Sequence, residues 1–269
     1  MAGWDPPERK AALMEFLKDN KVNLMTNNLD DCYKQIVSKM HKWDQRLPEL
    51  LLIDFTNLLE KSGINPLDYC SEIYPHQYKN HKFKNLVIPD GVTTIGEEAF
   101  ANSLIESIVF PDSLKEIQSC AFYSTSLTDI IIPDSVVRIG DHAFGSCYEL
   151  ENVVIGSGLK EISDGTFYNC GITSITIPNN ITSIGATAFQ ECNLVSIKIP
   201  DSVEFIGQGA FRLCSFLKSV IIGNGVTKIE LGAFKNCKSI TDVIIPERFK
   251  PKLQNIFGAR TNKINFTFV

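Results

Sequence analysis

The residues best able to do chemistry in this chain are its 8 cysteines and 4 histidines. Thiolate and imidazole groups bind zinc or act as nucleophiles when their spacing brings them together. Five of the cysteines are instead separated by 22 or 23 residues, and no C-x-x-C pair occurs in the sequence. These five are Cys147, Cys170, Cys192, Cys214 and Cys237. The spacing indicates a structural repeat, and we expect a column of small, buried thiols.

The other candidate groups form no recognised motif. Cys70, His76 and His81 are close in sequence but offer only three ligands, one fewer than a structural zinc site needs. His142 stands at a variable position of a repeated segment, so we expect it on the surface. The sequence therefore predicts no catalytic residue, no metal site and no cofactor, and we interpret the protein as a non-enzyme.

A phenylalanine, most often preceded by alanine, recurs along most of the chain. The spacings between successive copies are 22, 22, 23, 22, 22 and 23 residues. The copies are Phe100, Phe122, Phe144, Phe167, Phe189, Phe211 and Phe234, with degenerate copies at Tyr78 and Phe257. A constant period of this length is typical of a solenoid, whose terminal repeats are usually atypical.

The repeated segments read Ile-Pro-Asp-Ser-Val and then Ile-Gly-x-x-Ala-Phe. Clear copies run over residues 130–144 and 197–211, and two other copies have Gly156 and Gly223 in place of the proline. This pattern resembles the BspA-like leucine-rich repeats from about Tyr78 to Val269. The resemblance implies a right-handed solenoid with one short parallel strand per turn, and a role in adhesion or protein binding, often at cell surfaces.

The alternation of side chains along a strand predicts which residues face the core. One inward column contains Leu86, Ile108, Ile130, Val153, Ile175, Ile197, Val220 and Val243. A second contains Ile88, Phe110, Ile132, Ile155, Ile177, Ile199, Ile222 and Ile245. The Ile of Ile-Gly and the repeated Phe are expected on the opposite wall. The final segment, residues 264–269, alternates like a last strand that closes the solenoid.

The residues between these columns point outward and are the candidate partner-binding residues. The outward column consists of Val87, Val109, Ile131, Val154, Thr176, Lys198, Ile221 and Ile244. A polar column precedes it by two residues and consists of Asn85, Ser107, Asp129, Asn152, Ser174, Ser196, Ser219 and Asp242. An apolar column beside a polar one suits a protein-binding sheet, but the same β-branched residues also stabilise a strand ladder.

The first quarter of the chain has helical signals and no repeat. The sequence therefore predicts a small all-α domain at residues 1–74 and a leucine-rich-repeat solenoid of about eight to nine coils at residues 75–269. The helices are interpreted as a cap on the solenoid, or as a second binding or dimerisation module. Their 11 Lys/Arg and 12 Asp/Glu up to residue 82 leave no basic face for DNA.

Composition and the absence of a leader-like segment favour a cytoplasmic protein. The net charge is −5, no basic block occurs, and no stretch is apolar enough to cross a bilayer. We expect a protein partner, no nucleic acid, no membrane, and a monomer with weak self-association at most. A cytoplasmic interaction module is the leading interpretation. A surface or secreted adhesin whose leader was removed, and a structural self-assembling subunit, are the alternatives.

Overall fold

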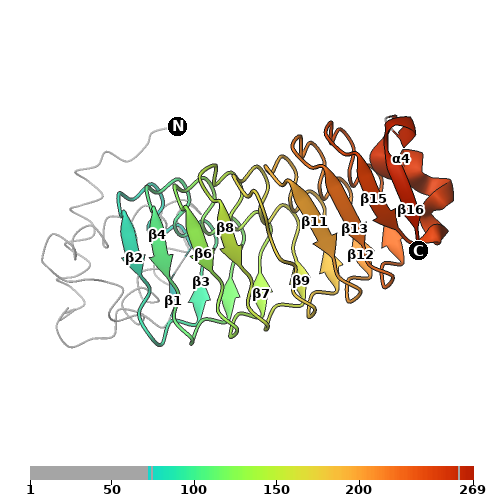
Figure 1. The fold of residues 1–269 in the computed structure, drawn as a ribbon. Helices are drawn as coiled ribbons and strands as arrows, with labels where there is room; N and C mark the ends of the chain where they lie inside the picture. Colours follow the sequence, from blue (N-terminus) through green and yellow to red (C-terminus); the bar gives the residue numbers. More distant parts are fainter. Residues whose placement is uncertain (1–71, 74, 260) are drawn as a thin grey trace, which may run out of the picture.

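The computed structural model describes residues 72–73, 75–259 and 261–269, which form an elongated stack of parallel coils (Figure 1). The expected helical domain at residues 1–74 lies almost entirely outside these residues. The first described strand, β1 (Glu72–Ile73), already pairs in parallel with β3 (Thr94–Ile95) and thus belongs to the solenoid.

All coils but the one containing residues 174–177 contribute to a long row of strands on one side of the stack. This row contains β2 (Asn85–Val87), β4 (Ser107–Val109), β6 (Asp129–Ile131), β8 (Asn152–Val154), β11 (Ser196–Ile199), β13 (Ser219–Ile222), β15 (Asp242–Ile245) and β16 (Asn265–Phe268). All pairings in the row are parallel, and they form the sheets β2-β4-β6-β8 and β11-β13-β15-β16. The expected closing strand is thus confirmed, because β16 pairs with β15.

A second, short row of strands corrects the expectation of one strand per turn. It contains β1, β3, β5 (Glu116–Ile117), β7 (Arg138–Ile139), β9 (Glu161–Ile162), β10 (Ser183–Ile184), β12 (Phe205–Ile206) and β14 (Lys228–Ile229). Each of these strands has two residues and ends on a buried isoleucine, so the Ile of Ile-Gly supplies the inward residue. Two residues are too few for an alternating pattern, which is why the sequence does not reveal this row.

Glycine follows the isoleucine of four short-row strands, β3, β7, β10 and β12, and at Gly140 and Gly207 neighbouring coils approach closely. A Cβ at Gly207 would lie 2.5 Å from the backbone nitrogen of Ala186, and one at Gly140 would lie 2.4 Å from that of Ser119. Contacts this short exclude any side chain unless the backbone moves. The glycine therefore serves coil packing, beyond the turn role that its position next to a strand suggests.

The repeated aromatic residues stack into one continuous column inside the solenoid. From Tyr78 to Phe257, neighbouring rings are 4.9–5.8 Å apart and nearly parallel, and each ring is buried. Tyr78 and Phe257 therefore complete the column at its two ends. A stack of offset aromatic rings adds to the stabilisation from burial.

Hydrogen bonds along a third line hold the coils together beside the aromatic column. The N–H of Phe122 donates to the carbonyl of Ala143 in the next coil at 2.8 Å, whereas the N–H of Ala121 donates to Gln118 in its own coil. The same alternation recurs in other coils. It requires a positive φ at the residues two before and two after the repeated aromatic residue, such as Glu98 and Asn102 around Phe100.

The C-terminal end is covered by short helices that precede β16. They are η2 (Glu247–Lys252), α4 (Leu253–Phe257) and η3 (Thr261–Lys263). Phe249, Ile256 and Phe257 are buried, and they cover the last coil. In the described part of the chain, no helix has the length and apolar character needed to cross a bilayer.

Candidate binding face on the long row of strands

The outward surface of the long row, here called the strand face, displays an apolar stripe. Val87, Val109, Ile131 and Val154 are 66%, 59%, 68% and 56% exposed. They come from β2, β4, β6 and β8, whose parallel register places these side chains directly beside one another. Exposed aliphatic side chains in one contiguous line are typical of an interaction surface.

The stripe does not continue beyond β8. The next two outward residues, Thr176 and Lys198, are polar and exposed, and Ile221 is 39% exposed. Ile244 is half-buried, so it is a weaker candidate than the outward alternation suggests. The apolar part of the predicted outward column is therefore concentrated on the first four long strands.

Half of the residues in the polar column beside the stripe are hydrogen-bonded to another residue of the column. Ser107 Oγ donates to Asn85 Oδ1 at 2.7 Å, and Asn152 Nδ2 donates to Asp129 Oδ1 at 2.5 Å. Asn265 and Asp242 repeat this contact at 3.2 Å. The hydrogen bonds from Asn152 and Thr128 lower the pKa of Asp129, so its carboxylate stays charged at neutral pH. Much of this column thus stabilises the ladder while still contributing negative charge.

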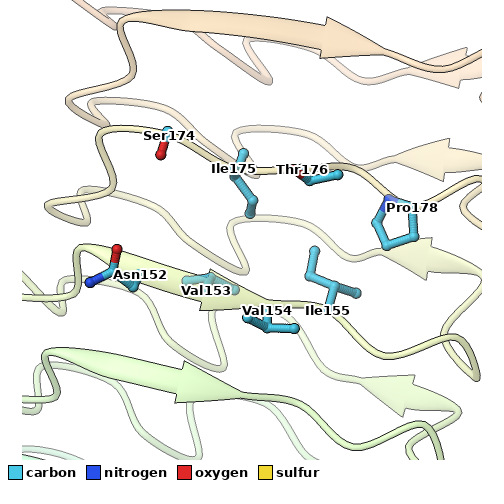
Figure 2. Close-up of a pocket in the computed structure, with 8 residues that line it drawn as sticks. All are labelled: Asn152, Val153, Val154, Ile155, Ser174, Ile175, Thr176 and Pro178. Carbon is cyan, nitrogen blue, oxygen red and sulfur yellow. The ribbon is translucent and has the colours of Figure 1, made fainter.

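Two hollows interrupt the strand face. One, of about 370 Å³, lies between β4 and β6 and is lined by Ile108, Phe110, Ile130 and Pro133, with Asp112 and Asp129 among its polar lining residues. The other, of about 470 Å³, lies between β8 and the segment 174–178. Figure 2 shows Ile155 and Ile175 extending into the gap between these two coils.

The hollows lie where pairing between neighbouring strands of the long row is reduced or absent. The bridge between β4 and β6 is restricted to Ser107 and Asp129, and residues 174–177 form no strand at all. Ile108 and Ile175 are accordingly half-buried, whereas Ile130 and Ile197 in the same inward column are almost fully buried. Apolar side chains of the core are thus reachable from the strand face at these two positions.

Acidic residues border the apolar stripe on both sides. Asp90, Asp112 and Asp134 follow the C-terminal ends of β2, β4 and β6, while Glu106, Asp129 and Glu151 lie at the N-terminal ends of β4, β6 and β8. Lys84 is the single basic side chain in segments 84–90, 106–112, 128–134 and 151–157, and it pairs with Glu106 at 2.9 Å. This half of the strand face is therefore strongly negative around an apolar centre.

The cysteine column is buried, as expected, and has a structural role. Each thiol donates to the carbonyl of a repeated Phe in the preceding coil, for example Cys192 to Phe167 at 3.1 Å and Cys237 to Phe211 at 3.0 Å. The six cysteines of the described residues are free thiols. Burial raises the pKa of Cys192 to about 12, so this sulfur is a poor nucleophile.

The histidines within the described residues make packing and ion contacts. His76 Nδ1 is 3.4 Å from Glu98, and the His81 ring stacks on Phe83 with centroids 3.7 Å apart. Cys70, which was considered with His76 and His81 as a zinc ligand, lies outside the described residues. Among residues 72–73, 75–259 and 261–269, no group of three or more potential ligands could hold a metal ion.

His142 is half-buried, which corrects the expectation of a surface residue. Its ring lies so close over Gly165 of the next coil that a Cβ there would be 2.2 Å from the imidazole. The ring also meets Tyr168 edge-on, with centroids 5.9 Å apart. The positive φ of 53° turns the residue toward its neighbouring coil, and this backbone conformation could not be deduced from the sequence.

The coil geometry and repeat pattern define a parallel β-solenoid of the leucine-rich-repeat class. The sequence profile of the BspA type leucine rich repeat region, in 6 copies, matches residues 71–195 and 182–268. The chain therefore belongs to the BspA-type leucine-rich repeat family. No curated protein matches the chain.

Solved structures of bacterial leucine-rich repeat proteins resemble this one. A leucine-rich repeat protein from Bacteroides ovatus is 27% identical with a TM-score of 0.54, and the match covers 74% of this chain and 60% of that one. A leucine rich cell surface protein from Faecalibacterium prausnitzii is 26% identical, with a TM-score of 0.44 and coverages of 76% and 64%. A leucine-rich repeat protein from T. pallidum is 25% identical, with a TM-score of 0.46 and coverages of 74% and 90%.

The chain thus spans less than two thirds of the length of the B. ovatus protein.

Proposed function

We propose that this protein is a non-catalytic interaction module that binds a protein partner on the strand face. The observation that carries this proposal is the apolar stripe above two hollows, where four aliphatic side chains are each more than half exposed. Ladder packing alone does not explain why the inward residues Ile108 and Ile175 are accessible from this face.

The test compares partners that co-purify from native lysate with the wild-type chain and with an Ile131→Lys/Val154→Lys variant. Both side chains point to solvent, so the variant is expected to fold, which circular dichroism checks. The matched control is Val137→Lys/Leu231→Lys, because Val137 and Leu231 are 59% and 62% exposed beside β7 and β14 of the short row. We expect the partner to be lost only with the strand-face variant.

A partner that survives the strand-face substitutions contradicts the proposal. The stripe would then stabilise the ladder only, and the first quarter of the chain would become the place to search. Equal loss with both lysine variants would also contradict it, because the effect would then follow from added charge and not from the face.

We further propose a reducing, cytoplasmic location, since the six cysteines of the described residues are free thiols. Export and adhesion to host or matrix proteins is the competing proposal, and the resemblance to surface adhesins motivates it. Thiol counting on protein from its native source separates the two. Free column thiols support the cytoplasmic proposal, and oxidised ones support export.

A further inference from the structure

The strand face carries three parallel lines of side chains over its first four strands. The apolar stripe, defined by Val87, Val109, Ile131 and Val154, occupies the middle. One acidic row, Asp90, Asp112 and Asp134, flanks it at the strand ends. A second acidic row flanks it at the strand starts and consists of Glu106 and Glu151, with Asp129 one residue further along in the register. A partner that covers the stripe must therefore place positive charge on both sides of an apolar centre.

The second half of the strand face lacks this arrangement. Thr176 and Lys198 replace two of the aliphatic residues, and the remaining two, Ile221 and Ile244, are less exposed than those of the apolar stripe. The acidic Asp201, Asp242 and Glu247 are offset by Lys198 and Lys218. The contrast within one repeated scaffold locates the complementary surface on β2, β4, β6 and β8.

The two hollows set the spacing of the side chains that anchor a partner. They lie between β4 and β6 and between β8 and segment 174–178, so they are separated by two coil steps along the solenoid. Neighbouring strands are about 4.8 Å apart, which places the hollows about 10 Å apart. Two turns of an α-helix advance about 10.8 Å, so residues i and i+7 of one helix face can reach both hollows.

A helix also satisfies the charge pattern better than an extended strand does. An α-helix carries an apolar stripe with residues on both of its flanks, whereas a strand divides its side chains between two opposite faces. All six carboxylates of the two acidic rows are exposed to solvent. Opposite charge across such a rim steers encounter and fixes orientation more than it adds affinity.

We propose that the occupant of this surface is an amphipathic helix of a partner protein, with its apolar face bordered by Lys or Arg on both sides and seated along the apolar stripe. The inference rests on the proposed function, since it names the chemistry of the partner for the same face. The helix axis runs along the solenoid, across β2, β4, β6 and β8, and apolar residues at i and i+7 enter the two hollows.

The experiment measures binding of defined peptides to the full chain by fluorescence anisotropy. The probe is an 18-residue peptide of Leu and Lys in which Leu repeats at i, i+3, i+4 and i+7. Two control peptides have the same length: one alternates Leu and Lys at the period of a strand, and the other replaces every Lys by Glu. We expect the helical Leu/Lys peptide to bind, both controls to bind at least about tenfold more weakly, and binding to weaken as salt rises.

Chain variants then locate the bound peptide. Asp112→Asn/Asp129→Asn removes two rim charges and is expected to weaken binding by about fivefold. Glu161→Gln/Glu204→Gln makes the same change in net charge beside the short row, where both residues are exposed, and is expected to leave binding unchanged. Ile131→Lys/Val154→Lys is expected to abolish binding while retaining the circular dichroism spectrum of the wild type.

Preference for the strand-period peptide, for the Leu/Glu peptide, or an equal effect of both charge variants overturns the inference. The proposed function is judged separately by the cellular partner. If Ile131→Lys/Val154→Lys loses that partner but the helical Leu/Lys peptide does not bind the wild type, the face is the binding site and the basic-helix inference is wrong. If the helical Leu/Lys peptide binds the strand face but Ile131→Lys/Val154→Lys still retains the cellular partner, the proposed function is wrong instead.

Discussion

At the scale of single residues, the least expected feature is left-handed backbone at side chains other than glycine. The residue two before the repeated Phe has a positive φ in every described coil where the Phe occurs, and it is Gly165, Gly209 or Gly232 in some coils but Thr187 in another. For L-residues this conformation costs about 1–2 kcal/mol, and a β-branched side chain such as threonine tolerates it least. The coil-to-coil hydrogen bonds on either side impose it.

Thr187→Gly is therefore expected to raise the free energy of unfolding by about 1 kcal/mol, against the usual effect of adding glycine. The strain at φ 52° is relieved, and three other coils already have glycine at this position. Urea denaturation followed by circular dichroism measures the change. The control, Thr173→Gly, lies at an exposed position without a positive φ and should lose about 0.5–1 kcal/mol. Equal losses at both positions would show that no strain is stored at Thr187.

The buried thiols make stability depend on pH on the alkaline side. Burial raises the pKa of Cys192 from 9.0 to about 12. Above pH 9 the unfolded thiol loses its proton while the folded one retains it, so the folded state binds more protons and stability falls as pH rises. The contribution is about 1.4 kcal/mol per pH unit between these two values.

Cys192→Ala should consequently give a shallower decline of unfolding free energy between pH 9 and pH 11 than the wild type. Denaturant titrations at several pH values measure both slopes. The variant loses the hydrogen bond to Phe167, so its curve starts lower, but only the slope bears on the pKa. Parallel curves for the two proteins would rule out a raised thiol pKa.

At the scale of elements, the strand rows are interrupted near the middle of the solenoid. The long row breaks between β8 and β11, and the short row breaks between β7 and β9. The rings of Phe144 and Phe167 are 5.8 Å apart, the widest spacing in the aromatic column. The repeat from Phe144 to Phe167 has 23 residues, and the extra residue lies in the connector that leads to β8. Other 23-residue repeats keep their strand pairing, so the length of the repeat alone does not explain the interruption.

Residues 174–177 should exchange their amide hydrogens about tenfold faster than the equivalent residues 196–199 of β11, because β11 is hydrogen-bonded to β13 and segment 174–177 belongs to no ladder. Hydrogen exchange followed by mass spectrometry of peptides covering each segment provides the comparison. The two segments occupy the same place in neighbouring coils, so each serves as the control of the other. Equal protection would mean that the ladder is continuous in solution.

At the scale of the whole molecule, the C-terminal end is closed and the strand face is divided in two. Strand β16 completes the last sheet, and Phe266 meets Phe257 edge-on with centroids 5.3 Å apart. Strand β16 is itself the last strand of this sheet, and the short helices η2 and α4 contribute the buried Phe249, Ile256 and Phe257 that cover the last coil.

Deletion of residues 264–269 should convert the protein into a self-associating one. The deletion moves the sheet edge from β16 to β15 and uncovers the ring of Phe257, and the newly exposed apolar ring favours contact with a second copy. Light scattering over a range of concentrations should show a mass that rises for the deletion variant and stays constant for the wild type. A folded deletion variant with constant mass would show that residues 264–269 do not prevent self-association at this end.

The solenoid, its period and the two inward columns could be predicted from the amino-acid sequence. This was possible because burial in a repeat protein depends on side-chain type at fixed spacing, and this pattern recurs from Tyr78 to Phe257. The free thiol column and the outward direction of Val87 to Val154 followed from the same reasoning.

The way in which neighbouring coils fit together could be seen only in the three-dimensional structure. The structure revealed the two-residue strands of the short row, the left-handed residues beside each Phe, the half-burial of His142, and the hollows at Ile108 and Ile175. Each depends on backbone distances between coils, which side-chain periodicity does not record. The acidic residues are visible in the sequence, but their position on both sides of one apolar stripe depends on the register of four strands.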